Sequence, residues 1–211
     1  MSSTSDNNFE AWRRSLRDLT GTREASQLWR EQRYRFAHAL GASLVSPPDG
    51  TVEFTGPVLY GVWLDWGLLY VGQTTRGARR LRDLAVGESH HLGNSFPPET
   101  WSKVAVVAWP CLPSASSAIE VIDIATVGLA LEHLVQQAHQ PLVNEHQRRP
   151  DGGWRTVQHA KRRSRGALAA ETVTDLFSEV QAVWARAEAV PSGDNLTEGP
   201  LRVVSPTTLL D

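Results

Sequence analysis

The stretch from Val58 to Leu81 constrains the fold of this chain more strongly than any other part of its sequence. Two apolar runs rich in aromatic and β-branched residues, 58–64 and 68–71, flank a short Asp-Trp-Gly segment. Strand formers on both sides of a short turn that contains glycine predict a β-hairpin. The predicted hairpin carries Tyr60 and Tyr70, and an arginine-rich helix is expected to follow it. Tyrosine hydroxyls and guanidinium groups are suited to binding a phosphodiester.

The chain as a whole has the properties of an ordinary globular protein. Its 211 residues are enough for one hydrophobic core with extensions. No apolar run approaches the roughly 18 residues that indicate a transmembrane helix, and the polar N-terminus lacks the apolar region of a secretory signal. A single cysteine, Cys111, excludes an intramolecular disulfide and a cysteine-based zinc cluster. These features predict a cytoplasmic protein without a membrane partner.

The first 50 residues are expected to form a helical arm. Apolar residues recur at helical spacing between Phe9 and Leu40, and Gly21-Thr22 is predicted to divide this region into two helices. Arginines and acidic residues are interleaved along both helices. This pattern fits an ordinary solvated surface, and it also fits an arm, 1–50, that contacts DNA or a second subunit.

The middle of the chain predicts a short strand before the hairpin and, after it, a helix, a loop, a buried strand and a long helix. The expected bounds are 51–54 for the first strand and then 76–86, 87–100, 104–109 and 118–138. The loop carries His90 and His91, for which an exposed loop position is the default interpretation.

Several separated motifs of this region, in the right order, resemble the GIY-YIG nuclease family. Tyr60 ends the first motif, Tyr70-Val71-Gly72 forms the second, and Arg80 follows on the predicted helix at the family's spacing. A helical glutamate, Glu132, is followed by Pro-Leu-Val-Asn ending in Asn144, which resembles the family's metal-binding glutamate and later asparagine. Taken singly, these residues also fit core tyrosines, surface charges and a helix cap.

The resemblance implies an α+β fold with α/β/α layers. A small antiparallel sheet flanked by helices would form the catalytic domain, 51–147, with helical extensions at both ends. It also implies a single Mg²⁺ or Mn²⁺ ion bound by Glu132, which is chemically sufficient because Mg²⁺ commonly keeps water ligands and uses substrate phosphate.

The family likewise implies a role for each remaining site residue. Tyr60 would activate the attacking water, Tyr70 would hydrogen-bond the phosphate or assist with the water, and Arg80 would bind the scissile phosphate. Asn144 would lie near the site. Because free tyrosine has a pKa of about 10, Tyr60 needs a cation or a proton acceptor beside it to act as a base.

This sequence departs from the family pattern at two places. Val58 begins the first motif where the family has glycine. The segment 61–63, Gly-Val-Trp, imitates the letters better, but it lies too close to Tyr70 and lacks the tyrosine. Leu84 stands where some relatives place a histidine after the arginine, so His90 or His91 is a candidate replacement.

The C-terminal third divides into a basic segment with an amphipathic helix, 148–190, and a tail, 191–211. The tail has few core formers and is expected to be flexible. The apolar stripe of the helix at 167–190 is predicted to pack against the domain or against another subunit, and Trp12 and Trp29 are further interface candidates. The expected DNA contacts are Arg76, Arg79, Arg148, Arg149, Arg155, Lys161, Arg162, Arg163 and Arg165.

Three functional hypotheses follow. The first is a site-specific type II restriction endonuclease that cuts double-stranded DNA as a homodimer, since one active site cuts one strand. The second is a structure-selective or nicking repair nuclease of the same fold that acts as a monomer. The third is a catalytically silent DNA-binding module.

Overall fold

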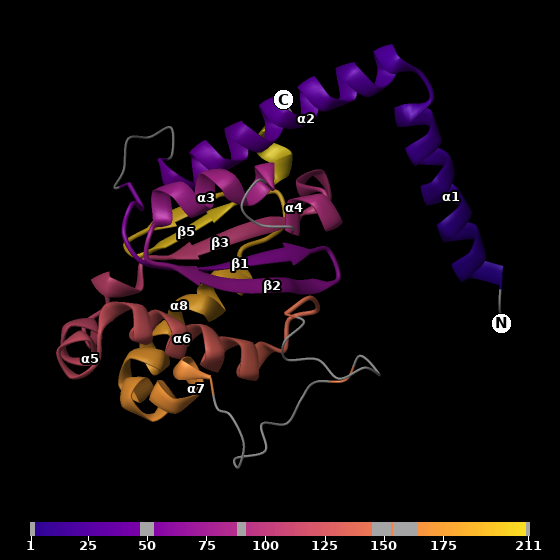
Figure 1. The fold of residues 1–211 in the computed structure, drawn as a ribbon. Coiled ribbons are helices and arrows are strands. Elements are labelled where there is room, and N and C mark those ends of the chain that lie inside the picture. The colour runs from indigo at the N-terminus through magenta and orange to yellow at the C-terminus, as the bar shows by residue number, and fades with distance from the viewer. Residues whose placement is uncertain (1–2, 47–52, 88–91, 145–152, 154–163, 210–211) are drawn as a thin grey trace.

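The computed structural model describes residues 3–46, 53–87, 92–144, 153 and 164–209. They form an α+β fold in which helices cover both faces of an antiparallel sheet (Figure 1), as the sequence predicts. Within the described residues the sheet has five strands in the order β2-β1-β3-β5-β4. The strands are β1 (Val58–Leu64), β2 (Gly67–Thr74), β3 (Lys103–Val107), β4 (Leu196–Glu198) and β5 (Leu201–Val204).

Two helical layers enclose the sheet. The α-helices are α1 (Ser3–Thr20), α2 (Arg23–Val45), α3 (Gly77–Val86), α4 (Leu92–Ser95), α5 (Ala115–Val121), α6 (Ile124–His139), α7 (Arg165–Ala169) and α8 (Thr174–Ala189). Short 3-10 helices lie at η1 (Pro98–Thr100), η2 (Trp109–Cys111), η4 (Ala170–Val173) and η5 (Pro206–Leu209). The helices α2 and α3 cover one face, and α6 and α8 cover the other with α5 and α7 beside them (Figure 1).

The hairpin of β1 and β2 lies where the sequence predicts it, and β1 is buried on both faces. Tyr60 and Val62 face the core under α2 and α3, whereas Leu59 and Trp63 face the core under α6 and α8. This alternation follows from the period of two in a strand. Because β3 pairs with the other side of β1, β2 is an edge strand of the sheet.

The N-terminal region forms two helices, as expected from Gly21-Thr22. The Thr22 hydroxyl accepts a hydrogen bond from the Ala25 N–H and caps α2. The second half of α2 packs on α3, and their close approach requires Gly41, because a Cβ there would lie 2.5 Å from the Arg82 carbonyl oxygen. The first half of α2 and all of α1 extend away from the sheet (Figure 1).

The predicted long helix at 118–138 is wrong in one respect, because it is divided into α5 and α6. The chain becomes extended at Ile122 and Asp123, and the Asp123 carboxylate accepts a hydrogen bond from the Thr126 N–H. A residue with this capping contact begins a new helix rather than continuing the old one. The predicted loop at 87–100 similarly contains α4 and η1, and residues 53 and 54 are not in a strand, whereas 51 and 52 lie outside the described residues.

The predicted flexible tail is wrong for residues 191–209. This segment contains β4 and β5, and β5 pairs with β3 along Leu201–Val204. Arg202 is fully buried, and its guanidinium donates hydrogen bonds to the carbonyls of Leu44 and Val45 at the end of α2. A buried arginine needs such partners, and the composition of the segment did not reveal them.

The C-terminal helical region is part of the core. The single helix predicted at 167–190 consists of α7, η4 and α8, and Val180, Val183 and Trp184 of its stripe are buried against the sheet of the same chain. Of the two expected roles for this stripe, packing against the domain is the one observed.

Among the described residues, no helix combines the length and apolar character needed to cross a membrane.

Candidate functional site

Tyr60 and Tyr70 lie side by side on the face of the hairpin that is covered by α3. Tyr60 exposes 1% of its surface, whereas Tyr70 is only partly buried. Their ring centroids are 6.1 Å apart, and their side chains are hydrogen-bonded to each other. Tyr60 therefore lies beneath Tyr70, and Tyr70 is the more accessible of the two.

Arg80 lies in the second turn of α3 and is partly buried. Its positive charge lowers the pKa of Tyr60, of Tyr70 and of Glu132. Since such an effect requires proximity, the guanidinium lies near all three groups. The structure brings together these four residues, which come from the four elements β1, β2, α3 and α6.

Glu132 belongs to α6, which covers the opposite face of the sheet from α3. It joins the site because β2 is an edge strand, so that a side chain from α6 extends past this edge. The carboxylate of Glu132 accepts hydrogen bonds from the backbone N–H of Gln73 and from the side-chain amide of Gln136, the latter at 3.3 Å. We name Tyr60, Tyr70, Arg80 and Glu132 the tyrosine–arginine–glutamate cluster.

The open edge of β2 is closed by the segment after α6. The N–H groups of Leu142 and Val143 donate to the carbonyls of Leu68 and Leu69. Asn144 then contacts Val71 twice, since its side-chain oxygen accepts from the Val71 N–H at 3.1 Å and its amide donates to the Val71 carbonyl at 2.9 Å.

These contacts give the asparagine a positioning role. Asn144 is buried, with 8% of its surface exposed, and Val71 lies between Tyr70 and Gly72 in β2. The structure thus places this predicted site residue beside the outer edge of the strand that carries Tyr70, where it satisfies backbone groups that an edge strand otherwise leaves unpaired.

Burial dominates the protonation of the cluster. Burial raises the pKa of Glu132 to about 7, and the Arg80 charge and the Gln73 N–H oppose this shift. Burial also raises the pKa of Tyr70 to about 12, with a further contribution from the Glu132 charge, and it raises the pKa of Tyr60 well above its ordinary value. Both tyrosines are therefore neutral at physiological pH and act as hydrogen-bonding groups.

The residues of the cluster fit a divalent cation. Glu132 is a buried carboxylate whose ionised form is disfavoured, and a cation beside it would stabilise that form. In the part of the chain that the structure describes, no group of three or more His, Cys, Asp or Glu side chains is gathered as a metal site. A single carboxylate suits Mg²⁺, which commonly completes its octahedral shell with water and substrate phosphate.

The remaining predicted residues are dispersed or lie outside the described residues. Arg76 and Arg79 are exposed near the start of α3, and Arg165 is exposed in α7, where it pairs with Asp123. Leu84, at the position of the histidine found in some relatives, is buried in the core. The predicted residues outside the description are His90, His91, Arg148, Arg149, Arg155, Lys161, Arg162 and Arg163, and so is the side chain of Trp12.

Sequence reasoning did not identify Gln136 or the backbone of Gln73 as parts of the site. Gln136 lies one helical turn after Glu132, and side chains at this spacing are neighbours on a helix. The spacing of four residues was therefore the feature of the sequence that could have identified Gln136 as a neighbour of Glu132. The contribution of the Gln73 N–H depends on the pairing of β2 and has no signal in the local sequence.

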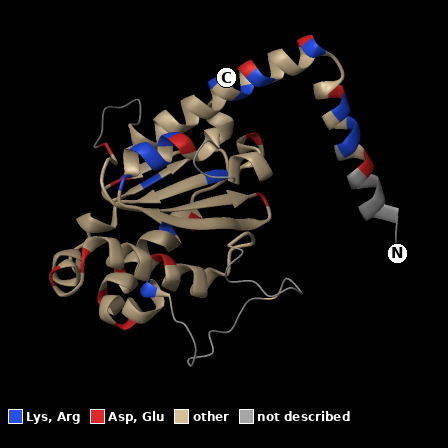
Figure 2. Cartoon of the chain, in the orientation of Figure 1, with Lys and Arg blue, Asp and Glu red and all other residues tan. Residues whose placement is uncertain are grey.

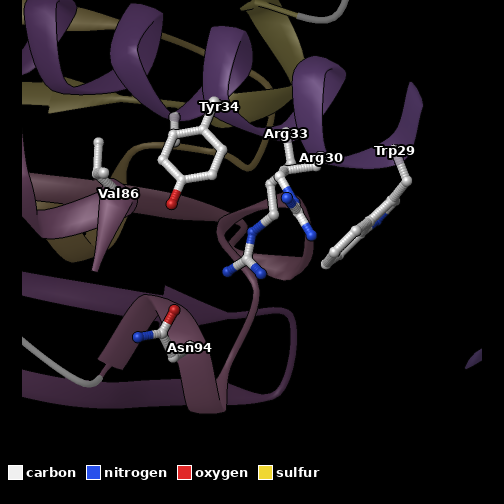
Figure 3. Close-up of a pocket in the computed structure, with 7 residues that line it drawn as sticks. Trp29, Arg30, Arg33, Tyr34, Val86 and Asn94 are labelled. Carbon is white, nitrogen blue, oxygen red and sulfur yellow. The ribbon is translucent and has the colours of Figure 1, made fainter. Parts of the chain in front are cut away.

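A separate hollow lies between α2 and α4 (Figure 3). Its volume is about 190 Å³, and it is lined by Trp29, Arg30, Arg33, Tyr34, Ala37, Val86 and Asn94. Arg33 contacts the ring of Trp29 and donates to the Gly93 carbonyl, so its guanidinium is already engaged within the chain. The lining includes no member of the tyrosine–arginine–glutamate cluster.

Fold and site together define an α+β protein with a tyrosine–arginine–glutamate cluster at the β2 edge of an antiparallel sheet. Comparisons with protein-family models, with curated proteins and with solved structures find no match for this chain.

Proposed function

We propose that this chain is a divalent-metal-dependent DNA endonuclease of the GIY-YIG type that hydrolyses phosphodiester bonds. The observation that carries the proposal is the convergence of Tyr60, Tyr70, Arg80 and Glu132 from β1, β2, α3 and α6. A guanidinium, an accessible hydroxyl and a carboxylate are the groups required to bind a phosphodiester, to orient water and to hold a cation.

Each residue has a role consistent with its surroundings. Arg80 binds the scissile phosphate, and Tyr70 donates a hydrogen bond to a phosphate oxygen or orients the attacking water. Tyr60, to which the family resemblance assigns activation of water, is buried and instead holds Tyr70 through their shared hydrogen bond. Glu132 holds Mg²⁺ or Mn²⁺, which when bound supplies neutralisation of charge on the phosphoryl oxygens and on the leaving oxygen.

The distribution of charge supports an approach of DNA from the side of α2 and α3. Taken together, α1, α2 and α3 carry more arginines than acidic residues, whereas acidic residues outnumber basic ones in α5 to α8 (Figure 2). A polyanion is attracted to the first surface and repelled by the second. Arg76, Arg79 and Arg80 lie on the attractive side.

Within this class we favour a site-specific restriction endonuclease that cuts both strands as a homodimer. One cluster hydrolyses one strand, so a double-strand cut needs a second copy or a second binding event. Among the described residues, α1 and the exposed part of α2 are candidate segments for DNA and subunit contacts, and the basic residues 148–163, which the sequence predicts to contact DNA, lie outside the described residues.

The test is cleavage of a long DNA of mixed sequence with Mg²⁺, compared with EDTA and with the Glu132→Gln variant. Glu120→Gln, an exposed glutamate of α5, is the matched control. Discrete fragments from the wild type and from Glu120→Gln, absent in EDTA and in Glu132→Gln, are expected. Single-strand nicks would instead favour the repair or nicking nuclease. DNA binding without cleavage, on unmodified and modified DNA alike, would favour the silent module.

A further inference from the structure

We propose that Gln136 is a positioning residue that holds the Glu132 carboxylate against the strand bearing Tyr70. This inference rests on the proposed function, because it assigns a task to a residue beside the cation-binding carboxylate. Gln136 does not belong to the cluster itself, and it acts through Glu132.

The side-chain amide of Gln136 donates in two directions. Its Nε2 atom lies 3.2 Å from the Val71 carbonyl oxygen and 3.3 Å from Oε1 of Glu132. The side chain is buried, with 7% of the residue exposed. An amide nitrogen carries two hydrogens, so one acceptor on the strand and one on the carboxylate satisfy both.

The Val71 carbonyl, which accepts from Gln136, is also held by a second residue. The Val71 carbonyl also accepts from the amide of Asn144 at 2.9 Å, and the Val71 N–H is bound by the same asparagine. Gln136 therefore connects Glu132 to a backbone position that is held in place from outside the helix. The backbone N–H of Gln73, two residues further along β2, binds the same carboxylate.

These bonds link α6 to the strand that carries Tyr70. Glu132 is carried by α6 on one face of the sheet, whereas Tyr70 and Arg80 lie toward the other face. A glutamate side chain has several rotamers, and hydrogen bonds from the Gln136 amide and the Gln73 N–H favour the one in which the carboxylate meets both donors. Partners of this kind orient metal ligands, and their removal typically costs about 10–100-fold in metal affinity or activity.

The experiment compares Gln136→Met, which keeps the shape of the side chain but removes its donors, with Gln181→Met. Gln181 is a partly buried glutamine of α8 that contacts His139 away from the site. Both variants are assayed for thermal unfolding, for DNA affinity in EDTA, and for the Mg²⁺ dependence of DNA cleavage. Binding of Mn²⁺, followed by electron paramagnetic resonance in the presence of a short DNA duplex, gives a readout that does not need cleavage.

For Gln136→Met we expect a 10–100-fold lower kcat or a 10–100-fold higher half-saturating Mg²⁺ concentration. We expect the KM for DNA and the DNA affinity in EDTA to match those of Gln181→Met. A merely structural role would lower the unfolding temperature and leave the Mg²⁺ dependence unchanged. Equal cation dependence in the two variants therefore refutes the positioning role.

The cation measurement separates this inference from the proposed function. If the wild type does not cleave DNA, the nuclease proposal fails, but weaker Mn²⁺ binding in Gln136→Met than in Gln181→Met still supports the positioning role. Equal Mn²⁺ binding in both variants, or Mn²⁺ binding that persists unchanged in Glu132→Ala, rejects it.

Discussion

Gly72 lies directly opposite Tyr60 in the β1–β2 ladder, and a Cβ at Gly72 would come within 2.6 Å of the Tyr60 hydroxyl oxygen. The same atom would lie 2.7 Å from the Tyr70 ring. The absence of a side chain at this position therefore creates the space in which the two tyrosines meet.

Substitution of Gly72 by alanine should displace both tyrosines. We expect cleavage to fall about 100-fold, because misplacing a reacting group by about 1 Å has an effect of this size. Overpacking should also lower the free energy of unfolding by about 1–3 kcal/mol. Cleavage kinetics and urea unfolding measure the two effects. Gly56→Ala is the control, since a Cβ at Gly56 meets no atom within 4 Å, and equal behaviour of the two variants would contradict this account.

Replacement of Arg80 by lysine should reduce cleavage about 100-fold, the typical cost of losing one charge-stabilising donor. Lysine keeps the charge but lacks the planar pair of donors that binds a phosphate. Arg82→Lys, two residues away, exposed and not among the expected DNA contacts, should retain most of the activity. Single-turnover rates at saturating enzyme distinguish this loss from weaker DNA binding. A comparable loss in both variants would show that the effect is not specific to Arg80 and would contradict its assignment to the scissile phosphate.

The pH dependence of stability should reveal the buried carboxylate. The pKa of Glu132 is about 7 in the folded chain and is ordinarily 4.5, so the folded state binds the proton more tightly than the unfolded state does. Its contribution to stability is fully present below pH 4.5 and is lost as the pH rises through 7. The corresponding loss is on the order of 3 kcal/mol.

Glu132→Gln should therefore lose less stability than the wild type between pH 5 and about 8 in EDTA. Unfolding by urea across this range measures the difference, with Glu120→Gln as the control for removal of an exposed carboxylate. Mg²⁺ or Mn²⁺ should stabilise the wild type more at the upper end of the range than at the lower, because the ionised carboxylate binds the cation. If the free energy of unfolding changed equally with pH in the wild type and in Glu132→Gln, a raised pKa of Glu132 in the folded chain would be excluded.

Asn144→Ala should destabilise the chain by about 2 kcal/mol, because it leaves the buried N–H and carbonyl of Val71 with fewer partners. Cleavage should fall as well, since Val71 adjoins Tyr70. Asn94→Ala removes an exposed asparagine that donates one bond to the Gly87 carbonyl, and it should change unfolding by less than about 0.5 kcal/mol. Chemical denaturation measures the change in the free energy of unfolding for both variants, and the DNA cleavage assay measures the change in activity. An Asn144→Ala variant that is stable yet inactive would point to direct contact with substrate.

Arg202→Met tests whether the C-terminal strand is needed to hold α2. The variant loses the hydrogen bonds of the guanidinium to Leu44 and Val45 and its contact with the Phe54 ring. We expect a loss of about 3 kcal/mol, as for hydrogen bonds made by a charged donor. Arg186→Met breaks only an exposed ion pair with Glu198 and should cost less than about 1 kcal/mol. Equal thermal unfolding of the two variants would refute this role.

Sequence alone determined the hairpin, the helix after it and the positions of Tyr60, Tyr70 and Arg80 along them. These features depend on local patterns: alternation in strands, a glycine in the turn and helical spacing of apolar residues. The division of the N-terminal region at Gly21-Thr22 was predictable for the same reason.

Only the tertiary structure decided how Glu132 joins the cluster, what Asn144 and Gln136 bind, and where the C-terminal segment lies. The glutamate meets the tyrosines because β2 is an edge strand, which depends on the order of strands in the sheet. The strand at 201–204 is short and has an arginine in its interior, so its burial depends on pairing with β3 and on carbonyls at the end of α2. Contacts between residues so distant in the chain are decided by packing and backbone hydrogen bonding, and a local sequence pattern does not encode them.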